Sequence, residues 1–330
     1  VDAPHVILGT PFRQPFGLSE DRTPFFQGIA PFKFSPKYGG GALKVVGTLV
    51  DVGNLSLQGI GSMEVLAMSG DVRGNGTLDI AGRLRIVAGQ IYPPTATRFV
   101  IGVADYIEGG QTTSGKLEIM AAAGRAAPLS AGGELALYAG DIIQGGALVA
   151  PFGRIVVGWD GVGVAPRNAI SGQSYPVTKR LELKGGSRIS VSGLDALDGK
   201  EMRVPYGVLT SAREWVDPMG VDISASGIPM KQLSLGGTEV LVAQGSVLDI
   251  RGGGDALAFR WISGVGGTRD VLGQETGYAV LPDYGLPYAP YAPFTSDPSA
   301  KLLSGNRGYV SAGLNIGDSV VLEGGGGLGA

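Results

Sequence analysis

The sequence has no cysteine and only one histidine, His5. The absence of cysteine excludes disulfide bridges, thiolate metal sites and cysteine nucleophiles. A single histidine cannot supply a multi-histidine metal site, and any serine–histidine–aspartate triad would have to be built around His5. A lone histidine is more often an ordinary core or surface residue than a catalyst. We therefore expect no catalysis at His5 and expect stability to come from packing and hydrogen bonds.

The sequence also lacks a charge excess and a long apolar run. Its 26 basic and 29 acidic residues give a formal charge of −3, and the basic residues are scattered. This balance argues against a nucleic-acid partner, because neutralising phosphates requires clustered Lys and Arg. No apolar run reaches the roughly 18 residues that span a bilayer. The chain begins with Val1, carries no signal peptide and ends with four glycines at 324–327 followed by three more residues, so we expect a processed or internal piece of a longer protein.

Glycine, by contrast, is abundant, at 58 of 330 residues. Such an excess indicates many backbone corners with positive φ, or many close approaches between chain segments. Collagen is excluded because glycine follows no strict three-residue period. Hydrophobic residues make up 44% of the chain and the mean hydropathy is +0.20, which excludes a disordered polar linker. The chain can therefore bury a core.

Short apolar segments separated by Gly, Asp and Asn recur along the chain. They are residues 43–46, 50–52, 55–57, 63–67, 78–80, 84–87, 117–120, 135–138, 155–157, 181–183, 189–191, 240–242 and 248–250. Within several of them a charged residue stands between two aliphatic ones, and these triplets are centred on Lys44, Arg85, Glu118, Glu182 and Asp249. This period-two alternation predicts strands of three to five residues with the aliphatic side chains inside and the charges outside. No helical stripe of useful length competes with it.

A longer phrase, two alternating apolar residues followed by glycine and a second apolar strand, also recurs. It occupies residues 64–72, 84–91, 117–124, 135–143, 181–191 and 240–250. Where no insertion intervenes, the spacing is about 18 to 20 residues, which is one coil of a parallel β-helix. We therefore expect an all-β fold, a right-handed parallel β-helix (solenoid) with inserted loops. The alternative is a β-sandwich or barrel, whose longer strands and Asn-Gly or Asp-Gly hairpins fit less well.

The spacing of the apolar segments predicts how the chain is divided. Residues 1–40, rich in Pro and Phe, are expected to be a lead or arm packed on the solenoid, which takes up residues 41–330. Inserted loops are expected near 159–180, 204–232 and 278–294. The last insertion is rich in Tyr and Pro, and aromatic faces stack on sugars and apolar partners. Its candidate ligand or partner residues are Tyr278, Tyr284, Tyr288, Tyr291 and Phe294, with sealing of the solenoid's side as the alternative role.

Motifs for chemistry are sparse. Residues 317–320, Gly-Asp-Ser-Val, would need a histidine further along the chain to act as an esterase block, and none follows. Residues 252–255, Gly-Gly-Gly-Asp, are similar to a calcium turn, but such turns function in tandem arrays, so we expect no cofactor, with calcium as the alternative. Parallel β-helices also host polysaccharide lyases and hydrolases, which need converging carboxylates. The sequence does not place Asp217, Asp222 and Glu239 together, so we expect no enzyme.

Two tracts resemble a known family. Residues 144–158, Gln-Gly-Gly-Ala-Leu-Val-Ala-Pro-Phe-Gly-Arg-Ile-Val-Val-Gly, resemble the β-helical phrase of filamentous haemagglutinin-like exoproteins of two-partner secretion. The second tract runs from Pro-Tyr-Gly at 205–207 to Asn-Ile-Gly-Asp-Ser-Val at 315–320. It passes through Glu-Trp-Val-Asp at 214–217, the stretch 245–255, Phe-Arg-Trp at 259–261, Gly-Gly-Thr-Arg-Asp at 266–270 and Tyr-Ala-Val-Leu-Pro at 278–282. That order is similar to the carboxy-terminal β-helical region of large haemagglutinin-family outer-membrane proteins of Gram-negative bacteria.

The resemblance covers the chain from about residue 135 onward. Before that, only the general pattern of short apolar segments and glycines is similar. It implies a secreted, surface-displayed adhesin or filament component, which mediates attachment, cell–cell contact or biofilm contact. The implied partners are an outer-membrane β-barrel transporter of the parent protein and glycans or proteins on host or neighbouring cells. Self-association into filaments is a further expectation, because terminal coils expose sheet edges. The alternative function is a β-helical protein that binds or cleaves polysaccharide.

Overall fold

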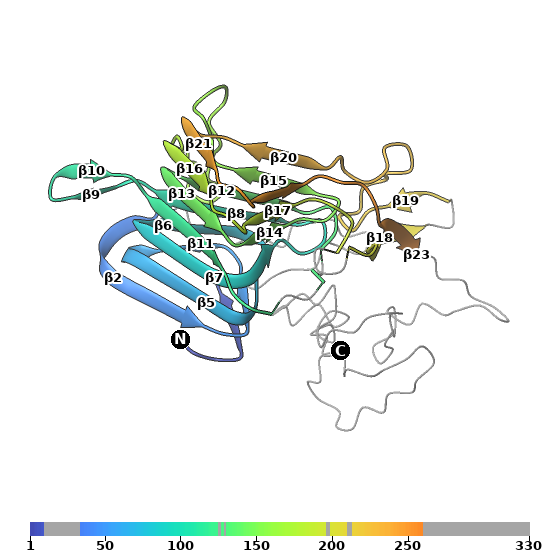
Figure 1. Cartoon of the computed structure of the whole chain (residues 1–330), viewed down its shortest axis with the longest axis horizontal. Helices are drawn as coiled ribbons and strands as arrows, with labels where there is room; N and C mark the ends of the chain where they lie inside the picture. The colour runs from blue at the N-terminus through green and yellow to red at the C-terminus, as the bar shows by residue number, and fades with distance from the viewer. Residues whose placement is uncertain (10–33, 125–126, 129, 196–198, 210–212, 260–330) are drawn as a thin grey trace.

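The computed structural model describes residues 1–9, 34–124, 127–128, 130–195, 199–209 and 213–259. Across these residues all regular structure is β-strand, and there is no helix long and apolar enough to cross a membrane. Most neighbouring strands are parallel (Figure 1). The all-β prediction is thus confirmed. Parallel pairing argues against the sandwich and barrel alternatives, which are built from antiparallel strands.

The largest sheet has twelve strands. They are β1 (His5–Leu8), β2 (Lys37–Val46), β3 (Leu49–Val52), β5 (Gln58–Gly74), β7 (Arg83–Tyr92), β11 (Lys116–Ala121), β13 (Asp141–Gly145), β14 (Ala147–Val149), β16 (Arg180–Leu183), β17 (Arg188–Ser190), β21 (Glu239–Val242) and β22 (Val247–Asp249). All the strand pairs of this sheet are parallel.

A second parallel sheet has six strands. They are β4 (Leu55–Ser56), β6 (Gly76–Ala81), β8 (Arg98–Ala104), β12 (Glu134–Ala139), β15 (Arg154–Val157) and β20 (Gln232–Leu235). Two small units complete the described strands. One is the hairpin of β9 (Tyr106–Glu108) and β10 (Gln111–Thr113), and the other is the sheet of β18 (Arg203–Leu209), β19 (Trp215–Val216) and β23 (Asp255–Phe259).

The strands are stacked in three columns. The first column is β2, β5, β7, β11, β13, β16 and β21, and the second is β1, β3, β5, β7, β14, β17 and β22. The six-stranded sheet is the third column. Along the chain the order is first, second, third column and then first again, as in β2, β3, β4 and β5. The same cycle recurs in β13, β14, β15 and β16.

Each predicted apolar segment falls on a strand, but several strands are much longer than the three to five residues expected. β5 has 17 residues and β7 has 10. Both continue from the first column into the second, and the pairing of β5 with β7 shifts register between Ala67 and Asp71. The corner is therefore made by a local irregularity of a paired strand around Gly70, the glycine of the phrase at 64–72.

Aliphatic side chains in register form a buried core between the columns. The first column contributes a ladder whose members are at most 1% exposed: Met63, Leu84, Leu117, Ile142 and Leu181. Residues of the second and third columns belong to the same cluster, including Val50, Ile91, Leu78, Ile101 and Leu135. Burying each such side chain contributes about 1.5–3 kcal/mol. The dry aliphatic interior predicted from the alternation is therefore present.

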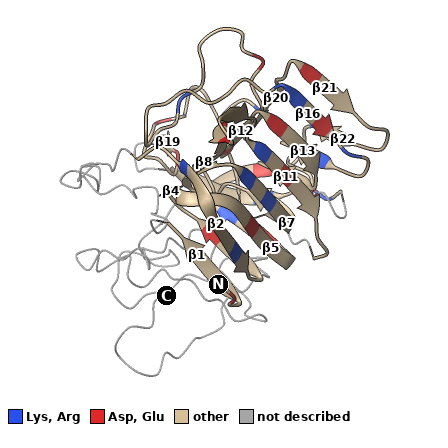
Figure 2. Ribbon diagram, turned by 90° about the vertical axis from the view of Figure 1, so that its left-hand side faces the viewer, with Lys and Arg blue, Asp and Glu red and all other residues tan. Residues whose placement is uncertain are grey.

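Charged residues line the outer face of the first column, as the triplets predict. Nζ of Lys44 lies 3.5 Å from Oε2 of Glu64, and Nη1 of Arg85 lies 2.5 Å from Oε1 of the same glutamate. Figure 2 shows basic and acidic positions distributed across β5, β7, β11, β13 and β16. Exposed ion pairs of this kind contribute about 0–1 kcal/mol each. These charges therefore contribute more to the solubility of the outer face than to the stability of the fold.

The segments that interrupt the rhythm have distinct structures. Within the expected lead, β1 pairs in parallel with β3, so this part of the lead belongs to the second column. Residues 159–179 connect β15 to β16 without forming a strand of either large sheet, whereas residues 204–232 include β19 and most of β18. Tyr206 of β18 is buried against Phe152. The insertion at 278–294 lies outside the described residues.

Candidate interaction surface at the terminal edge

The last strands of the three columns, β20, β21 and β22, form a surface that we call the terminal edge. Among the strands that the structure describes, β20 pairs only with β15, β21 only with β16 and β22 only with β17. Within the described part of the chain, their other sides therefore present backbone groups without a strand partner. An unpaired strand edge is a template for a further strand.

Apolar side chains are exposed along the terminal edge. Val240 and Val242 are 40% and 56% exposed, although they are in register with Leu181 and Leu183, which are fully buried. The difference arises because β16 has a strand on both sides and β21 on only one. Contiguous exposed apolar side chains mark interaction sites on soluble proteins. The terminal edge is thus the strongest candidate for association among the described residues.

The triplet at residues 248–250 departs from the predicted burial. Asp249 is 3% exposed, whereas Leu248 and Ile250 are 43% and 67% exposed. The expectation of buried aliphatic residues and an exposed charge is therefore wrong at this site. Leu248 still pairs with buried Ile189, so the strand keeps its register, but no described strand covers its core-facing side. Asp249 is buried because two arginine side chains and the adjoining chain enclose it.

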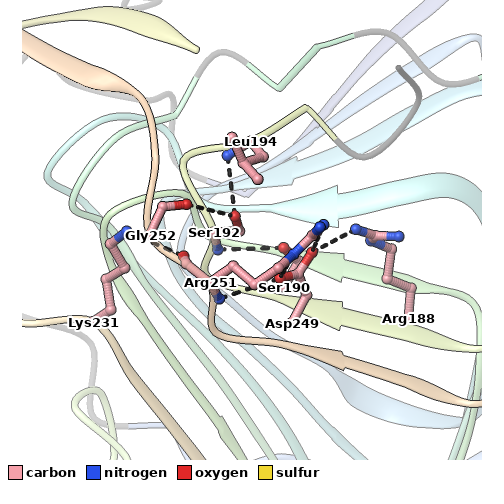
Figure 3. Close-up of polar contacts among 8 residues, drawn as sticks. All are labelled: Arg188, Ser190, Ser192, Leu194, Lys231, Asp249, Arg251 and Gly252. Atoms are coloured by element: carbon pink, nitrogen blue, oxygen red, sulfur yellow. Dashed lines mark hydrogen bonds and ion pairs between the residues drawn. The ribbon is translucent and has the colours of Figure 1, made fainter. Parts of the chain in front are cut away.

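Figure 3 shows the polar cluster around Asp249. Arg188 donates from Nη2 to Oδ2 of Asp249 at 2.6 Å. Arg251 donates from Nε to Oδ1 and from Nη2 to Oδ2, both at 2.9 Å, and its backbone N–H also reaches Oδ1 at 3.2 Å. Two-point pairing of a guanidinium with a carboxylate is the strong form of this interaction. The cluster holds β22 against β17.

Serine and lysine side chains extend the cluster along the chain that leaves the strands. Ser192 accepts from the backbone N–H of Leu194 at 3.1 Å and donates to the carbonyl of Gly252 at 3.4 Å. Lys231 donates to the carbonyl of Arg251 at 3.3 Å, and its Nζ lies 5.3 Å from the centroid of the Phe152 ring. The serine contact ties the segment after β22 to the segment after β17, and the lysine contact ties it to the residue that precedes β20.

The electrostatics of this cluster indicate binding or structure rather than proton transfer. Hydrogen bonds from Arg251 hold the pKa of Asp249 below its ordinary value, against the effect of burial. A carboxylate kept ionised by two guanidinium groups is a poor general acid, because its proton is already lost at neutral pH. The arrangement can fix the geometry of the terminal edge, and the exposed side of Arg251 can face an anionic partner.

The aromatic residues predicted as a ligand surface, Tyr278, Tyr284, Tyr288, Tyr291 and Phe294, lie outside the described residues. His5 is described, on β1, where its Nε2 lies 2.8 Å from Oδ2 of Asp51. Asp51 is fully buried and also accepts two hydrogen bonds from Arg73, at 2.7 and 2.8 Å. His5 thus takes part in a structural ion-pair network that joins β1, β3 and β5.

The candidate acids do not converge. Asp217 and Asp222 belong to one turn, where each carboxylate accepts a backbone N–H of its own loop. Glu239 begins β21 in a different sheet, in register with Arg180. Across the described ranges, no group of three or more His, Cys, Asp or Glu side chains could hold a metal ion.

The glycine turn at 252–255 serves as a corner. Gly253 and Gly254 have positive φ, and a Cβ on either would lie within 2.5 Å of an atom of residues 193–194. Asp255 opens β23, and its Oδ2 lies 3.7 Å from Nε of Arg203. The turn needs glycine for close packing, and its carboxylate lies against a cation.

Sequence reasoning missed the buried carboxyl of Asp79 on β6 and its partners Asn168 and Tyr175. In the sequence Asp79 stands between Leu78 and Ile80, which is the pattern of an exposed charge on a strand. Nothing local indicates that a segment nearly a hundred residues further along covers it.

Comparison of the chain with protein-family models, curated proteins and solved structures found no match.

Proposed function

We propose that this chain is a non-catalytic, structural segment of a secreted bacterial surface adhesin or extracellular filament, folded as a right-handed parallel β-helix. The observation that carries the proposal is the repeated passage of the chain through three columns of parallel, in-register strands. A strand that returns to its own sheet by a crossover does so right-handedly in about 98% of proteins, which supports the handedness.

Such an architecture suits an extended structural element better than an enzyme. Each cycle adds about 4.8 Å along the stack, so the seven strands of the first column account for roughly 30 Å. The core needs only neighbouring strands for its stability, so further cycles lengthen the molecule without redesigning it. Segments inserted between the columns can vary freely and carry recognition.

The cellular setting is proposed from the resemblance to filamentous haemagglutinin-like exoproteins. Residues 144–158, which carry part of that resemblance, contain β14 and β15 and the end of β13, and so make up one passage through the three columns. We propose that the parent protein leaves the cell through an outer-membrane β-barrel partner and contacts glycans or proteins on host or neighbouring cells. The absence of cysteine is compatible with export.

Negative-stain electron microscopy of the parent protein tests the proposal. The expected images are thin, stiff rods, and compact globular particles would overturn it. Incubation of the chain with acidic polysaccharides tests the absence of catalysis, with no new reducing or unsaturated ends expected. Appearance of such ends, abolished by neutralising Asp217 or Asp222, would instead establish a polysaccharide-cleaving enzyme.

A further inference from the structure

Residues 159–178, between β15 and β16, form a closed segment on the third column. At its base, Thr178 donates its N–H to the carbonyl of Trp159 at 2.8 Å and accepts the N–H of Trp159 on Oγ1 at 3.2 Å. Its hydroxyl in turn donates to the carbonyl of Ala139 on β12 at 2.8 Å. The base is therefore fastened to the sheet by neutral hydrogen bonds.

The tip of the segment has its own structure. Arg167 and Ser174 form an antiparallel bridge, and Tyr175 donates its N–H to the carbonyl of Pro166 at 2.9 Å. Oδ1 of Asn168 accepts the N–H groups of Ile170 and Ser171. The tip can thus keep its shape whether or not it rests on the sheet.

Tyr175 fills a notch in the outer face of the third column. Asp79 of β6, Gly102 of β8 and Tyr138 of β12 are in register, and the glycine leaves a gap between the other two side chains. The ring of Tyr175 stacks on Tyr138 with centroids 4.7 Å apart. A Cβ at residue 102 would lie 2.3 Å from Cε1 of Tyr175. The fit is therefore specific to glycine at this position.

The polar contact of the tip with the sheet is made to a buried carboxyl. Asp79 is 1% exposed, and its oxygens accept hydrogen bonds from Nδ2 of Asn168 and, at 3.3 Å, from the hydroxyl of Tyr175. Both partners are neutral, and in the described part of the chain no cation pairs with this carboxyl. Burying a carboxylate without a cation is costly, so the neutral acid fits this site better.

We propose that residues 159–178 are a pH-controlled latch, whose tip lies on the third column while Asp79 is protonated and lifts from it when Asp79 ionises. The base remains attached, because its hydrogen bonds do not titrate. Lifting the tip uncovers the ring of Tyr138 and the side chain of Val100, which form one apolar cluster with Tyr175. The outer face of the column then offers an aromatic surface that the closed latch hides.

Burial raises the pKa of Asp79 to about 7, although hydrogen bonds from Asn168 and Tyr175 oppose the rise. The phenols packed at the tip are those of Tyr138 and Tyr175, whose pKa values burial raises, so both stay neutral at physiological pH, and the tip itself carries the arginine side chain of Arg167. Arg98, Glu134 and Arg154 face Tyr138 from β8, β12 and β15. In the contact between the tip and the third column, the group that titrates between pH 5 and 8 is thus Asp79.

The raised pKa of Asp79 determines the direction in which docking of the tip changes with pH. Docking is strongest below the ordinary pKa of an aspartate, near 4, and weakens as the pH rises through the pKa of the docked state, about 7. Between pH 5 and 8 the docking equilibrium is expected to fall by about a hundredfold. Above pH 8 it changes little further.

Hydrogen–deuterium exchange of the full chain tests the latch, with labelling times scaled to the intrinsic exchange rate at each pH. Peptides covering residues 166–175 should be protected at pH 5 and exchange faster at pH 8, while peptides of β11 stay protected at both. Equal protection of the tip at the two pH values would overturn the proposal. This comparison needs no variant.

Variants assign the titrating group. Asp79→Asn keeps the hydrogen-bonding shape without a charge, so tip protection should become independent of pH. Asp160→Asn, at an exposed carboxyl of the same segment that caps the N–H of Val162, should retain the wild-type dependence. If Asp79→Asn keeps the full pH dependence, Asp79 is not the switch and the proposal fails.

Discussion

At the scale of single residues, two buried aspartates illustrate how surroundings decide charge. Asp51 lies between Arg73 and His5, and these partners hold its pKa below the ordinary value although burial opposes ionisation. Asp79 has only neutral partners, and burial raises its pKa. Folding thus favours the ionised form of this side chain in the second column and its neutral form in the third. Neighbouring charge, more than depth, sets the difference.

The Asp51 network predicts a loss of stability in acid. A group whose pKa is lowered by folding stabilises the fold above its unfolded pKa, near 4, and this stabilisation disappears as the pH falls further. Asp51→Asn leaves Arg73 buried without its counter-charge and is expected to cost about 3–5 kcal/mol at pH 7. Urea unfolding at pH 7 and pH 3 measures both effects. Equal differences between wild type and variant at the two pH values would contradict the assignment.

Gly102 predicts a steric effect confined to the 159–178 segment. In Gly102→Ala the added Cβ would lie 2.3 Å from Tyr175 and 2.4 Å from Oδ1 of Asp79, so Tyr175 must leave the notch. We expect a cost of about 1–3 kcal/mol and faster hydrogen exchange of the tip at every pH. Gly40→Ala is the matched control, because a Cβ there meets open space. If both variants behave alike, the notch has no specific role.

At the scale of elements, the sequence predicts strands well and their connections poorly. Alternating triplets such as those around Arg85 and Glu118 identify paired strands because the buried face imposes period two. The phrase at 64–72 turns at Gly70 inside a single strand, β5, whereas the similar phrase at 135–143 combines β12 and β13 from different sheets. The exposed Val240 and Val242 could not be anticipated, since burial depends on the neighbouring strand rather than on local pattern.

β11 offers a direct test of inside and outside. Ile119 is 1% exposed in the core, whereas neighbouring Glu118 faces outward with a carboxylate oxygen 3.9 Å from Nε of Arg85. Ile119→Ala is expected to lower the free energy of unfolding by about 2–5 kcal/mol. Glu118→Ala should cost under about 1 kcal/mol, as for other exposed ion pairs. Chemical denaturation measures the free energy of unfolding of the two variants. Comparable losses in both would show that the inward and outward positions of β11 are misassigned.

At the scale of the whole molecule, the two ends of the columns are not equivalent. At the start of the columns the core-facing side chains are covered, since Val45 of β2 is fully buried and Val6 of β1 is 5% exposed. The terminal edge instead ends in exposed valine and leucine side chains. Growth of the stack, by more strands or by another molecule, is therefore favoured at β20–β22. The sequence predicts such association only in general terms, through the expectation that terminal coils expose sheet edges.

Association through the terminal edge predicts concentration dependence. Sedimentation velocity should detect larger species as the concentration of the chain rises, and the double change Val240→Lys and Val242→Lys should suppress them, because charged side chains protect strand edges. Met68→Lys provides the control, since Met68 is 55% exposed on β5, which four strands of the first column separate from β21. A chain that stays monomeric at all concentrations would rule out this mode of assembly.

Stacking in columns also determines how the molecule bears tension. Interstrand hydrogen bonds point along the direction in which strands follow one another, so a pull from β2 towards β21 loads them lengthwise. At each level the bonds of all three columns share the force, and successive levels carry the same force in series, so the weakest level breaks first. Rupture at one level leaves the others folded. A tether built this way gives way in steps, dissipating work at each step while holding its remaining length.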